Sequence, residues 1–496
     1  MTNQKEIVAA TYIADNSSSH PRQLYLLFFT EMWERFSFYG MRALLVLYMV
    51  GQLKYGDAKA NLIYGTYTAL VYLMPFFGGL AADKVLGYKK AIILGGTLMA
   101  IGHLILAVPQ EWSFFAGMAF LISGNGFFKP NISTIVGRLY RPDDPRRDSA
   151  YSIFYMGVNV GAFFGSLLCG YIGEEINWHY GFGLAGIMMI VGLVIFLLNK
   201  HTLGEIGDTP VNKEGERIAI TKQLLILIAS LAIIPLFIYL FNHYTIMDNI
   251  MFPICILALV GMIALAFLQD VINRNKMLTA IILVAFSTLF WAFYEQGGGS
   301  LNLFTDRNVN TFGLPAASIN NSINPFYIIF LSFPFAWLWV SLAKRGKEPS
   351  TPMKFSSAFF QLALGFFLFV IGAKLCSADG RVSFFWYAAG YLFLTTGELC
   401  ISPIGLSMIT KLSPPQFTGM MMGFWFLASA LGQHLAGWIG TLMAIPSEGG
   451  ATTISPLESL SIYSGVFMKI TYVSIVGGIV LLLLVPLLRR WMSNVK

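Results

Sequence analysis

The chain has 496 residues, of which 56% are hydrophobic and only 11% are charged. A soluble domain carries about 25% charged residues, so this composition excludes an ordinary water-soluble enzyme or binding domain. The net charge of +7 could indicate binding to nucleic acid or contact with acidic lipid. The positions of the 32 Lys and Arg residues decide between these two interpretations.

Fourteen apolar runs follow one another along the chain, each long enough to cross a membrane. A span of about 30 Å of hydrocarbon takes roughly 20 helical residues at about 1.5 Å each. The predicted spans are residues 24–50, 60–81, 90–108, 112–137, 150–173, 180–199, 222–241, 250–269, 278–299, 317–341, 355–374, 383–409, 417–444 and 462–488. The predicted fold class is therefore an all-α membrane protein.

The basic residues indicate how these spans are oriented. With a cytoplasmic N-terminus, most Lys and Arg residues lie in inner loops and tails, which predicts that both termini are cytoplasmic. The outer loops hold only Lys54, Lys59, Arg307, Lys374 and Arg381. The basic excess is thus an orientation signal, and we expect no nucleic-acid partner.

The N-terminal residues and the cysteines exclude several other features. The first 22 residues are polar and lack an apolar core, so no cleavable signal peptide is expected and the first span acts as an uncleaved signal. The four cysteines stand singly in apolar runs, which predicts neither a disulfide nor a metal site. They are Cys169, Cys255, Cys376 and Cys400.

The longest polar stretch, residues 200–222, divides six spans from the rest and is interpreted as a cytoplasmic linker. Spans seven and eight are joined by a loop from Asn242 to Ile250 that has no basic residue, and they contain no buried charge, so they are interpreted as an inserted hairpin. Removing them leaves six spans plus six, a symmetry typical of transporters with a substrate site near the midplane. The predicted domains are an N-terminal six-helix bundle, residues 1–199, a cytoplasmic linker with the inserted hairpin, residues 200–276, and a C-terminal six-helix bundle, residues 277–496.

A few charged residues lie inside the predicted spans. A charge at a helix centre costs at least about 2.5 to 3.5 kcal/mol on insertion scales, so such residues are functional candidates. They are Glu31, Glu34, Arg35, Arg42, Lys129, Glu295 and Glu398.

The first span carries four of these charges on one face. At about 100° per residue, Glu31, Glu34, Arg35, Tyr39 and Arg42 point in similar directions, which predicts that this face lines a cavity. The alternative is that Glu31 and Arg35 merely neutralise each other as an i,i+4 pair. That alternative does not account for Arg42, which has no acidic neighbour on its own helix.

Lys129 lies in the segment GNGFFKPN, where Pro130 frees a backbone carbonyl one turn earlier. A buried lysine needs an anion, and the candidates are Glu31 or Glu34, Glu295, or a substrate carboxylate. A lysine that snorkels to the membrane surface is the alternative.

Two acidic residues mark the second half of the chain. Glu295 precedes Gly297–Gly299, which make that helix easy to bend. Two interpretations of this bend remain, a gate that opens during transport and a plain glycine kink. Glu398 lies in TTGELCISPIGLS, an apolar helix interrupted by Pro403, and is predicted to face a cavity.

The segment GGLAADKVLGYKK, residues 78–90, follows the second span on the predicted cytoplasmic side. Its glycines allow tight packing and Asp83 can meet a facing helix N-terminus, so the segment is interpreted as a conformational latch. The predicted gating residues are Gly78, Gly79, Asp83, Lys84 and Gly87. Among the six histidines, His103 and His434 lie in spans and are interpreted as packed or hydrogen-bonded, with proton transfer as the alternative.

Several segments together resemble one known family. EMWERFSFYG, residues 31–40, resembles the ExxER motif of the proton-dependent oligopeptide transporters within the major facilitator superfamily, and GGLAADKVLGYKK is similar to the loop motif of that superfamily. FFKPN around Lys129, FYMGVNVG around Asn159 and GELCISPIGLS around Glu398 also match the family. These matches cover both halves of the chain.

The resemblance implies a major facilitator fold, with two six-helix bundles plus two extra mid-chain helices. It implies a peptide site formed by Tyr39, Arg42, Tyr72, Lys129, Asn159, Asn324, Glu398, Ser402 and Trp425. It implies proton coupling by Glu31, Glu34, Arg35, Lys129 and Glu295. Phe38 departs from the tyrosine of many members, and the second span lacks the histidine of the animal relatives, which implies a bacterial-type carboxylate mechanism.

The function that we predict is proton-coupled symport of di- and tripeptides by alternating access, in the bacterial inner membrane, by a monomer that needs no cofactor or metal and uses the proton gradient. The alternative is a carrier of the same fold for another small anion, such as nitrate or an amino-acid conjugate. Glu398 argues against it because a carboxylate repels a simple anion. An enzyme is not expected, since no catalytic motif is present.

Overall fold

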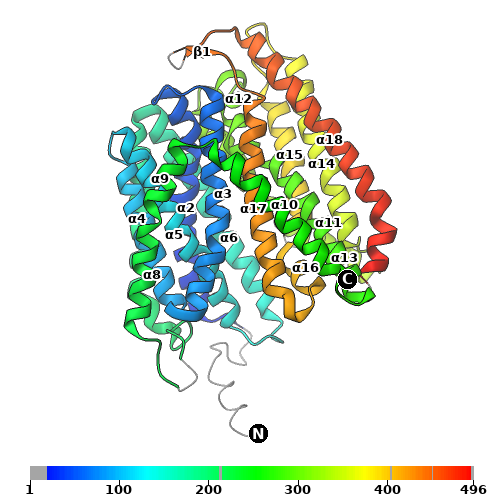
Figure 1. Cartoon of the computed structure of the whole chain (residues 1–496). Helices are drawn as coiled ribbons and strands as arrows, with labels where there is room; N and C mark the ends of the chain where they lie inside the picture. Colours follow the sequence, from blue (N-terminus) through cyan, green and yellow to red (C-terminus); the bar gives the residue numbers. More distant parts are fainter. Residues whose placement is uncertain (1–18, 212–214, 403–404, 449–450, 493–496) are drawn as a thin grey trace. The chain divides into compact units, whose positions relative to one another are not determined.

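The structure is a computed structural model that describes residues 19–211, 215–402, 405–448 and 451–492 (Figure 1). In this part of the chain, helices form fourteen successive segments that coincide with the fourteen predicted spans. The strands β1 (Ser447–Glu448) and β2 (Ala451–Thr452) form one short antiparallel hairpin. The all-α fold class is confirmed.

Packing divides the chain into two compact units. Unit 1 comprises residues 1–44 and 73–242, and unit 2 comprises residues 45–72 and 243–496. The inserted hairpin is therefore shared, because its first helical stretch packs within unit 1 and its second within unit 2. The functional division into three domains stays a prediction.

Unit 1 is built by close helix approaches at small residues. A Cβ added to Gly95 would lie 2.6 Å from the carbonyl oxygen of Gly124, and one on Gly102 would lie 2.8 Å from that of Gly117, so α4 and α5 approach with their backbones nearly in contact. The unit contains parts of α2 (Arg22–Gly51) and α3 (Asp57–Ala81), and then η1 (Ala82–Leu86), α4 (Tyr88–Leu106), α5 (Glu111–Arg138), α6 (Arg146–Tyr171), η2 (Ile172–Ile176), α7 (Trp178–Asn199), η3 (Lys200–Leu203), α8 (Ile220–Ala232) and α9 (Ile234–Asn242).

Unit 2 has an aromatic core. The ring of Phe369 lies within 6 Å of the rings of Phe366, Tyr387, Tyr391 and Phe467, which joins α14, α15 and α18. The unit contains the rest of α2 and α3, and then α10 (Ile246–Phe267), α11 (Val271–Tyr294), η4 (Glu295–Gly298), α12 (Ser300–Asn308), α13 (Ala316–Lys344), α14 (Thr351–Lys374), α15 (Phe384–Ile401), α16 (Gly405–Leu412), η5 (Pro415–Phe417), α17 (Thr418–Thr441) and α18 (Pro456–Trp491).

Ten helices in the described part of the chain are long and apolar enough to cross a membrane by length and composition. The other four predicted spans correspond to α2, α5, α15 and α17. Helix α2 is not apolar enough because it carries the acidic and basic residues that mark the first span as functional. The interior of unit 1 buries Glu31, Glu34 and Arg35, so the low hydropathy of α2 agrees with a spanning helix that faces protein.

Three details of the predicted organisation are wrong. The loop predicted from Asn242 to Ile250 is shorter, because α10 begins at Ile246 and places Asp248 in its first turn. Arg307 was predicted in an outer loop, but it lies in the last turn of α12. The ninth predicted span ends too early because the chain resumes a helix after the bend at η4.

The connection between α10 and α11 is a tight capped turn. Asp270 accepts hydrogen bonds from the backbone N–H groups of Asn273, at 3.3 Å, and of Ile272, at 3.1 Å. These bonds, first of all that from Asn273, hold the pKa of the Asp270 carboxyl below its ordinary value. The cap starts α11 directly after α10 ends.

A buried ion pair joins the start of α3 to the end of α12 within unit 2. Arg307 Nη1 lies 2.6 Å from Asp57 Oδ2 and Nη2 lies 2.8 Å from Oδ1, a bidentate pairing. The same Oδ2 accepts a hydrogen bond from the backbone N–H of Ile445 at 3.0 Å. Asp57 is thus a shared anchor for three segments of unit 2.

Replacing Asp57 with Ala is expected to destabilise the protein by about 3 to 5 kcal/mol, because the guanidinium of Arg307 would remain buried without its partner. The thermal unfolding midpoint of the purified protein measures this loss. Glu348→Ala is the matched control, since it removes an ion pair with Lys354 in which the carboxylate is 42% exposed. Equal midpoints for the two variants would contradict the structural role of Asp57.

Candidate functional site

The first candidate site is a buried charge cluster on α2. Glu31, Glu34 and Arg35 are 3%, 0% and 2% exposed. Arg35 donates to both oxygens of Glu34, with Nη2 at 2.6 Å from Oε1, and its Nε lies 3.1 Å from Glu31 Oε1. The predicted i,i+4 pair exists, but one guanidinium serves two carboxylates, so the pair does not neutralise the cluster.

Lys129 of α5 supplies the missing positive charge. Its ammonium group attracts the carboxylates of both Glu31 and Glu34. Of the anions that the sequence offered for Lys129, the structure brings these two together with it. With Arg35, the cluster has two acids and two bases, so protonation of either acid leaves a net positive charge inside unit 1.

Tyr39 and Arg42 continue the same face of α2. The guanidinium of Arg42 lies 5.9 Å from the centre of the Tyr39 ring, and that of Arg35 lies 6.0 Å from it. Both guanidinium groups therefore lie within about 6 Å of the Tyr39 ring, at the distance of a cation–π contact. The prediction that these residues share a face is confirmed.

Glycines of α6 bring Asn159 beside α2. A Cβ on Gly161 would lie 2.1 Å from the carbonyl oxygen of Met32, and one on Gly165 would lie 2.2 Å from that of Phe36. The glycine spacing of four residues gives α6 a smooth stripe against α2. Asn159 is 5% exposed, and its Nδ2 donates to the Tyr155 carbonyl at 2.9 Å.

The second candidate site surrounds Glu398 in unit 2. Glu398 is 8% exposed, and its Oε2 accepts hydrogen bonds from the hydroxyl of Tyr294 and from Asn324 Nδ2, the latter at 2.9 Å. The same amide lies 3.1 Å from Thr395 Oγ1, and the carboxylate of Glu295 repels Glu398. In the described part of unit 2, Glu398 has neutral donors and no paired cation.

The bend predicted after Glu295 is confirmed. α11 ends at Tyr294, η4 takes the next turn, and α12 begins at Ser300. Gln296 Nε2 donates to the carbonyls of Ala292 at 2.9 Å and Ala436 at 3.0 Å, so side-chain hydrogen bonds hold the bend. Its use as a gate stays a prediction.

Sequence reasoning missed two groups that hold this region. The first is the hydroxyl of Tyr294. The second is Asn320, whose Oδ1 accepts from Tyr387 at 2.8 Å and Tyr391 at 2.6 Å while its Nδ2 donates to the carbonyl of Gly297 at 2.6 Å. The signal for Asn320 was available, because several asparagines lie in an otherwise apolar span.

Ser402 and Trp425 lie near the break between α15 and α16. The backbone N–H of Ser402 donates to the carbonyl of Glu398 at 2.8 Å, and its side chain is exposed. A Cβ on Gly405 would lie 2.5 Å from the Trp425 ring, so this ring covers the start of α16. Pro403, which the sequence predicted to cause the break, lies outside the described residues.

The remaining residues of the predicted peptide site, Tyr72 and Asn324, are partly buried in α3 and α13. Asn324 is directly bonded to Glu398, as described above. The assembly of all nine residues into one peptide site stays a prediction.

The motif at residues 78–90 packs tightly at Gly78, as predicted, but not at Gly79. A Cβ on Gly78 would lie 2.0 Å from the carbonyl oxygen of Gly126, so α3 and α5 touch there, whereas Gly79 is 3.8 Å from the nearest atom of Pro130. Asp83 accepts a hydrogen bond from the hydroxyl of Tyr88 in the first turn of α4. Lys84 is exposed.

The linker before α8 packs against this motif, which the sequence did not predict. Gly87 has φ +78°, and a Cβ there would lie 2.4 Å from the carbonyl oxygen of Asp208. Lys89 Nζ lies 2.8 Å from Asp208 Oδ1, and Thr209 Oγ1 donates to the Leu86 carbonyl at 3.0 Å. A glycine is therefore required at position 87 by both conformation and space.

The two histidines inside spans are buried, as predicted. His103 is 0% exposed, and its ring nitrogens have no hydrogen-bond partner in the described structure. His434 is 1% exposed, and its Nε2 lies 2.7 Å from Asp248 Oδ1. His103 is thus a packed residue and His434 a hydrogen-bonded one.

A helical membrane protein with buried acid–base clusters in its spans has the features of a secondary transporter. The model of the POT family matches residues 89–454, and the chain belongs to this family. The chain is 34% identical to a structure described as peptide transporter POT in complex with sulfate, with a TM-score of 0.82 and 99% of each chain covered. The predicted major facilitator fold is therefore confirmed.

Similar sequences include bacterial transporters. The chain is 36% identical to the peptide transporter YePEPT of Yersinia enterocolitica subsp. palearctica and 32% identical to the dipeptide and tripeptide permease B of Salmonella typhimurium, with 96% of each chain covered. It is 35% identical, at the same coverage, to the uncharacterized transporter YclF of Bacillus subtilis.

Proposed function

We propose that this protein is a proton-coupled symporter that imports di- and tripeptides by alternating access. The observation that carries the proposal is the opposite chemistry of the two candidate sites. Unit 1 offers cations at Arg42 and Lys129, while unit 2 offers a buried carboxylate, Glu398, held by neutral donors. The names of two relatives, a peptide transporter and a dipeptide and tripeptide permease, support the same substrate class.

The chemistry of the two sites suits a short peptide because a short peptide is a zwitterion. Its carboxylate would be held by Arg42 and Lys129, and its ammonium by Glu398. A simple anion such as nitrate has no group for Glu398, and burying that charge without a partner is costly. The site chemistry therefore favours peptides over the alternative substrates.

The proton gradient is a sufficient energy source. A membrane potential of about 100 mV supplies about 2.3 kcal/mol per charge, and about one pH unit adds about 1.4 kcal/mol. One proton per cycle would support accumulation of several hundred-fold at about 1.4 kcal/mol per factor of ten. No cofactor is required in this scheme.

The setting that we propose is the bacterial inner membrane, with both termini in the cytoplasm. The bias of Lys and Arg toward the predicted inner loops supports this orientation. We further propose that one chain is the transporting unit, because the charge cluster of unit 1 and the Glu398 site of unit 2 both belong to the same polypeptide.

Uptake of a labelled dipeptide into proteoliposomes tests the proposal. Accumulation is expected when the external side is acidic and the interior negative, and it should vanish when a protonophore removes the gradient. Excess unlabelled tripeptide should compete, whereas nitrate should not. Accumulation that persists with the protonophore, or competition by nitrate alone, would contradict peptide–proton symport.

A further inference from the structure

Two buried polar layers join the same three segments of unit 2. The first layer is the Glu398 site, in which Tyr294, where α11 ends, and Asn324 of α13 donate to the carboxylate on α15. The second layer is centred on Asn320 of α13, which is 2% exposed. Because Asn320 is four residues before Asn324, the two layers are about 6 Å apart along α13 at about 1.5 Å per residue.

The amide of Asn320 bonds to two other segments at once. Its Oδ1 accepts hydrogen bonds from the hydroxyls of Tyr387 at 2.8 Å and Tyr391 at 2.6 Å, both on α15. Its Nδ2 donates to the carbonyl of Gly297, in the bend at η4, at 2.6 Å. A carbonyl oxygen only accepts, so the contact with Gly297 fixes which way the amide faces. Asn320 therefore ties α13 both to α15 and to the bend.

The second layer lies close to the first on every segment that they share. On α15, Tyr391 is seven residues before Glu398, which places both side chains on one face of the helix. In the bend, Gly297 is three residues after Tyr294. The position of the bend relative to α13 and α15 determines how the Tyr294 hydroxyl meets Glu398, and the Asn320 layer holds that position.

The bend has a second support that does not involve these helices. Gln296 donates to the carbonyl of Ala292 on α11 and to that of Ala436 on α17. Loss of Asn320 would leave this support in place. It would remove a link from the bend to α13 and α15, the helices that carry Asn324 and Glu398.

We propose that Asn320 is a positioning residue for recognition of the peptide amino terminus, an inference that rests on the proposed function. Asn320 acts through Gly297 to hold the hydroxyl of Tyr294 on the carboxylate of Glu398. A hydrogen bond to a carboxylate stabilises its charge and fixes its orientation. The carboxylate held in this way binds the ammonium group of the peptide, so the preference for a free amino terminus depends on Asn320.

Competition between a free dipeptide and its N-acetyl analogue, with the full-length protein in proteoliposomes, tests this role. Asn320→Ala should narrow the preference for the free peptide several-fold, by raising KM for the free dipeptide with little change in the maximal rate. Tyr294→Phe should also narrow it. The double variant should narrow it no further than Tyr294→Phe alone, because both changes act through one hydrogen bond. Additive effects, or an unchanged preference in either single variant, would overturn the positioning role.

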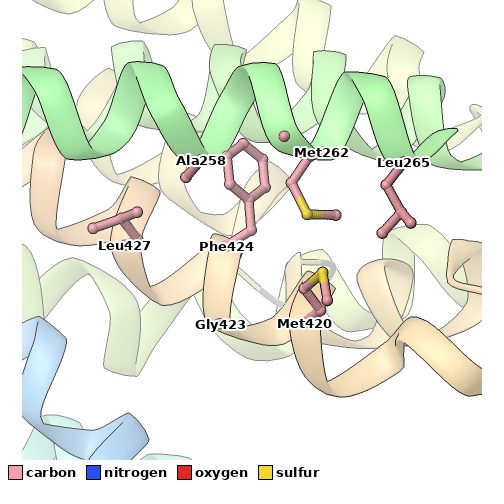
Figure 2. Close-up of a pocket in the computed structure, with 8 residues that line it drawn as sticks. Ala258, Met262, Leu265, Met420, Gly423, Phe424 and Leu427 are labelled. Atoms are coloured by element: carbon pink, nitrogen blue, oxygen red, sulfur yellow. The ribbon is translucent and has the colours of Figure 1, made fainter. Parts of the chain in front are cut away.

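Two controls separate positioning from a general loss of stability. Asn308→Ala removes a buried asparagine of α12 whose Nδ2 donates to the carbonyls of Pro456 at 2.9 Å and Gly380 at 3.2 Å. Met262→Ala removes a buried side chain that lines an apolar cavity of about 440 Å³ between α10 and α17 (Figure 2). Both controls should lower the thermal unfolding midpoint and leave the preference unchanged. A preference narrowed equally in the controls would overturn the specific role of Asn320.

Infrared difference spectra follow the Glu398 carboxyl without any peptide. Its band is the one that disappears in Glu398→Gln. The band should shift in Tyr294→Phe, shift in the same direction in Asn320→Ala, and stay in place in Asn308→Ala. An unshifted band in Asn320→Ala would overturn the positioning role even if peptides are transported. A shifted band in a protein that takes up no peptide would support the positioning of Tyr294 and contradict the proposed function alone.

Discussion

Glu398→Gln is expected to lower the affinity for a free dipeptide by at least about tenfold, while the affinity for its N-acetyl analogue changes much less. A tenfold loss corresponds to about 1.4 kcal/mol. This loss of binding free energy is smaller than the cost of breaking a buried charge pair, which is about 3 to 5 kcal/mol. In the structure Tyr294 and Asn324 both donate to Oε2 of Glu398, and we propose that the carboxylate also binds the ammonium group of the ligand. The variant keeps the shape of the side chain and removes only its charge.

Competition against labelled dipeptide uptake, with the matched pair of free and acetylated peptides, measures this change. Glu348→Gln is the control, because it removes a carboxylate that is 42% exposed. An unchanged preference in Glu398→Gln would show that this residue does not recognise the peptide amino terminus. Free amino acids and tetrapeptides should compete poorly in the parent protein, since each residue changes the separation of the two charges by at most about 3.6 Å.

Glu31→Gln and Glu34→Gln are each expected to abolish accumulation driven by the proton gradient while sparing part of the peptide counterflow. Both carboxylates are bound to Arg35 and attracted by Lys129 in a charge-balanced cluster. Protonation of either one leaves a positive charge without its partner, at a cost of about 3 to 5 kcal/mol. That cost is large enough to favour rearrangement of the transporter.

The measurement compares two assays on the same proteoliposomes. Accumulation needs proton coupling, whereas counterflow needs only peptide binding and reorientation, so loss of the first alone assigns the coupling role. Full accumulation in both variants would place coupling elsewhere, with Glu295 as the first residue to test. Loss of both activities together would indicate a role in binding or folding.

The amino-acid sequence by itself determined the membrane class, the fourteen helical segments and which charged residues lie inside them. These features are local, because hydrophobic length is read within one segment and a charge inside an apolar run is conspicuous wherever its partner lies. The common face of Glu31, Arg35 and Arg42 also followed from helical periodicity alone. The glycines after Glu295 predicted the bend at η4, because glycine weakens a helix wherever it occurs.

Only the tertiary structure decided which groups are partners. The sharing of Arg35 by two carboxylates and the hydroxyl of Tyr294 on Glu398 depend on rotamers and on packing between distant segments. The pairing of Asp57 with Arg307 joins residues that are 250 positions apart. The cavity between α10 and α17 was equally invisible, because the space left by Gly261 and Gly423 depends on how two helices approach and not on either sequence segment alone.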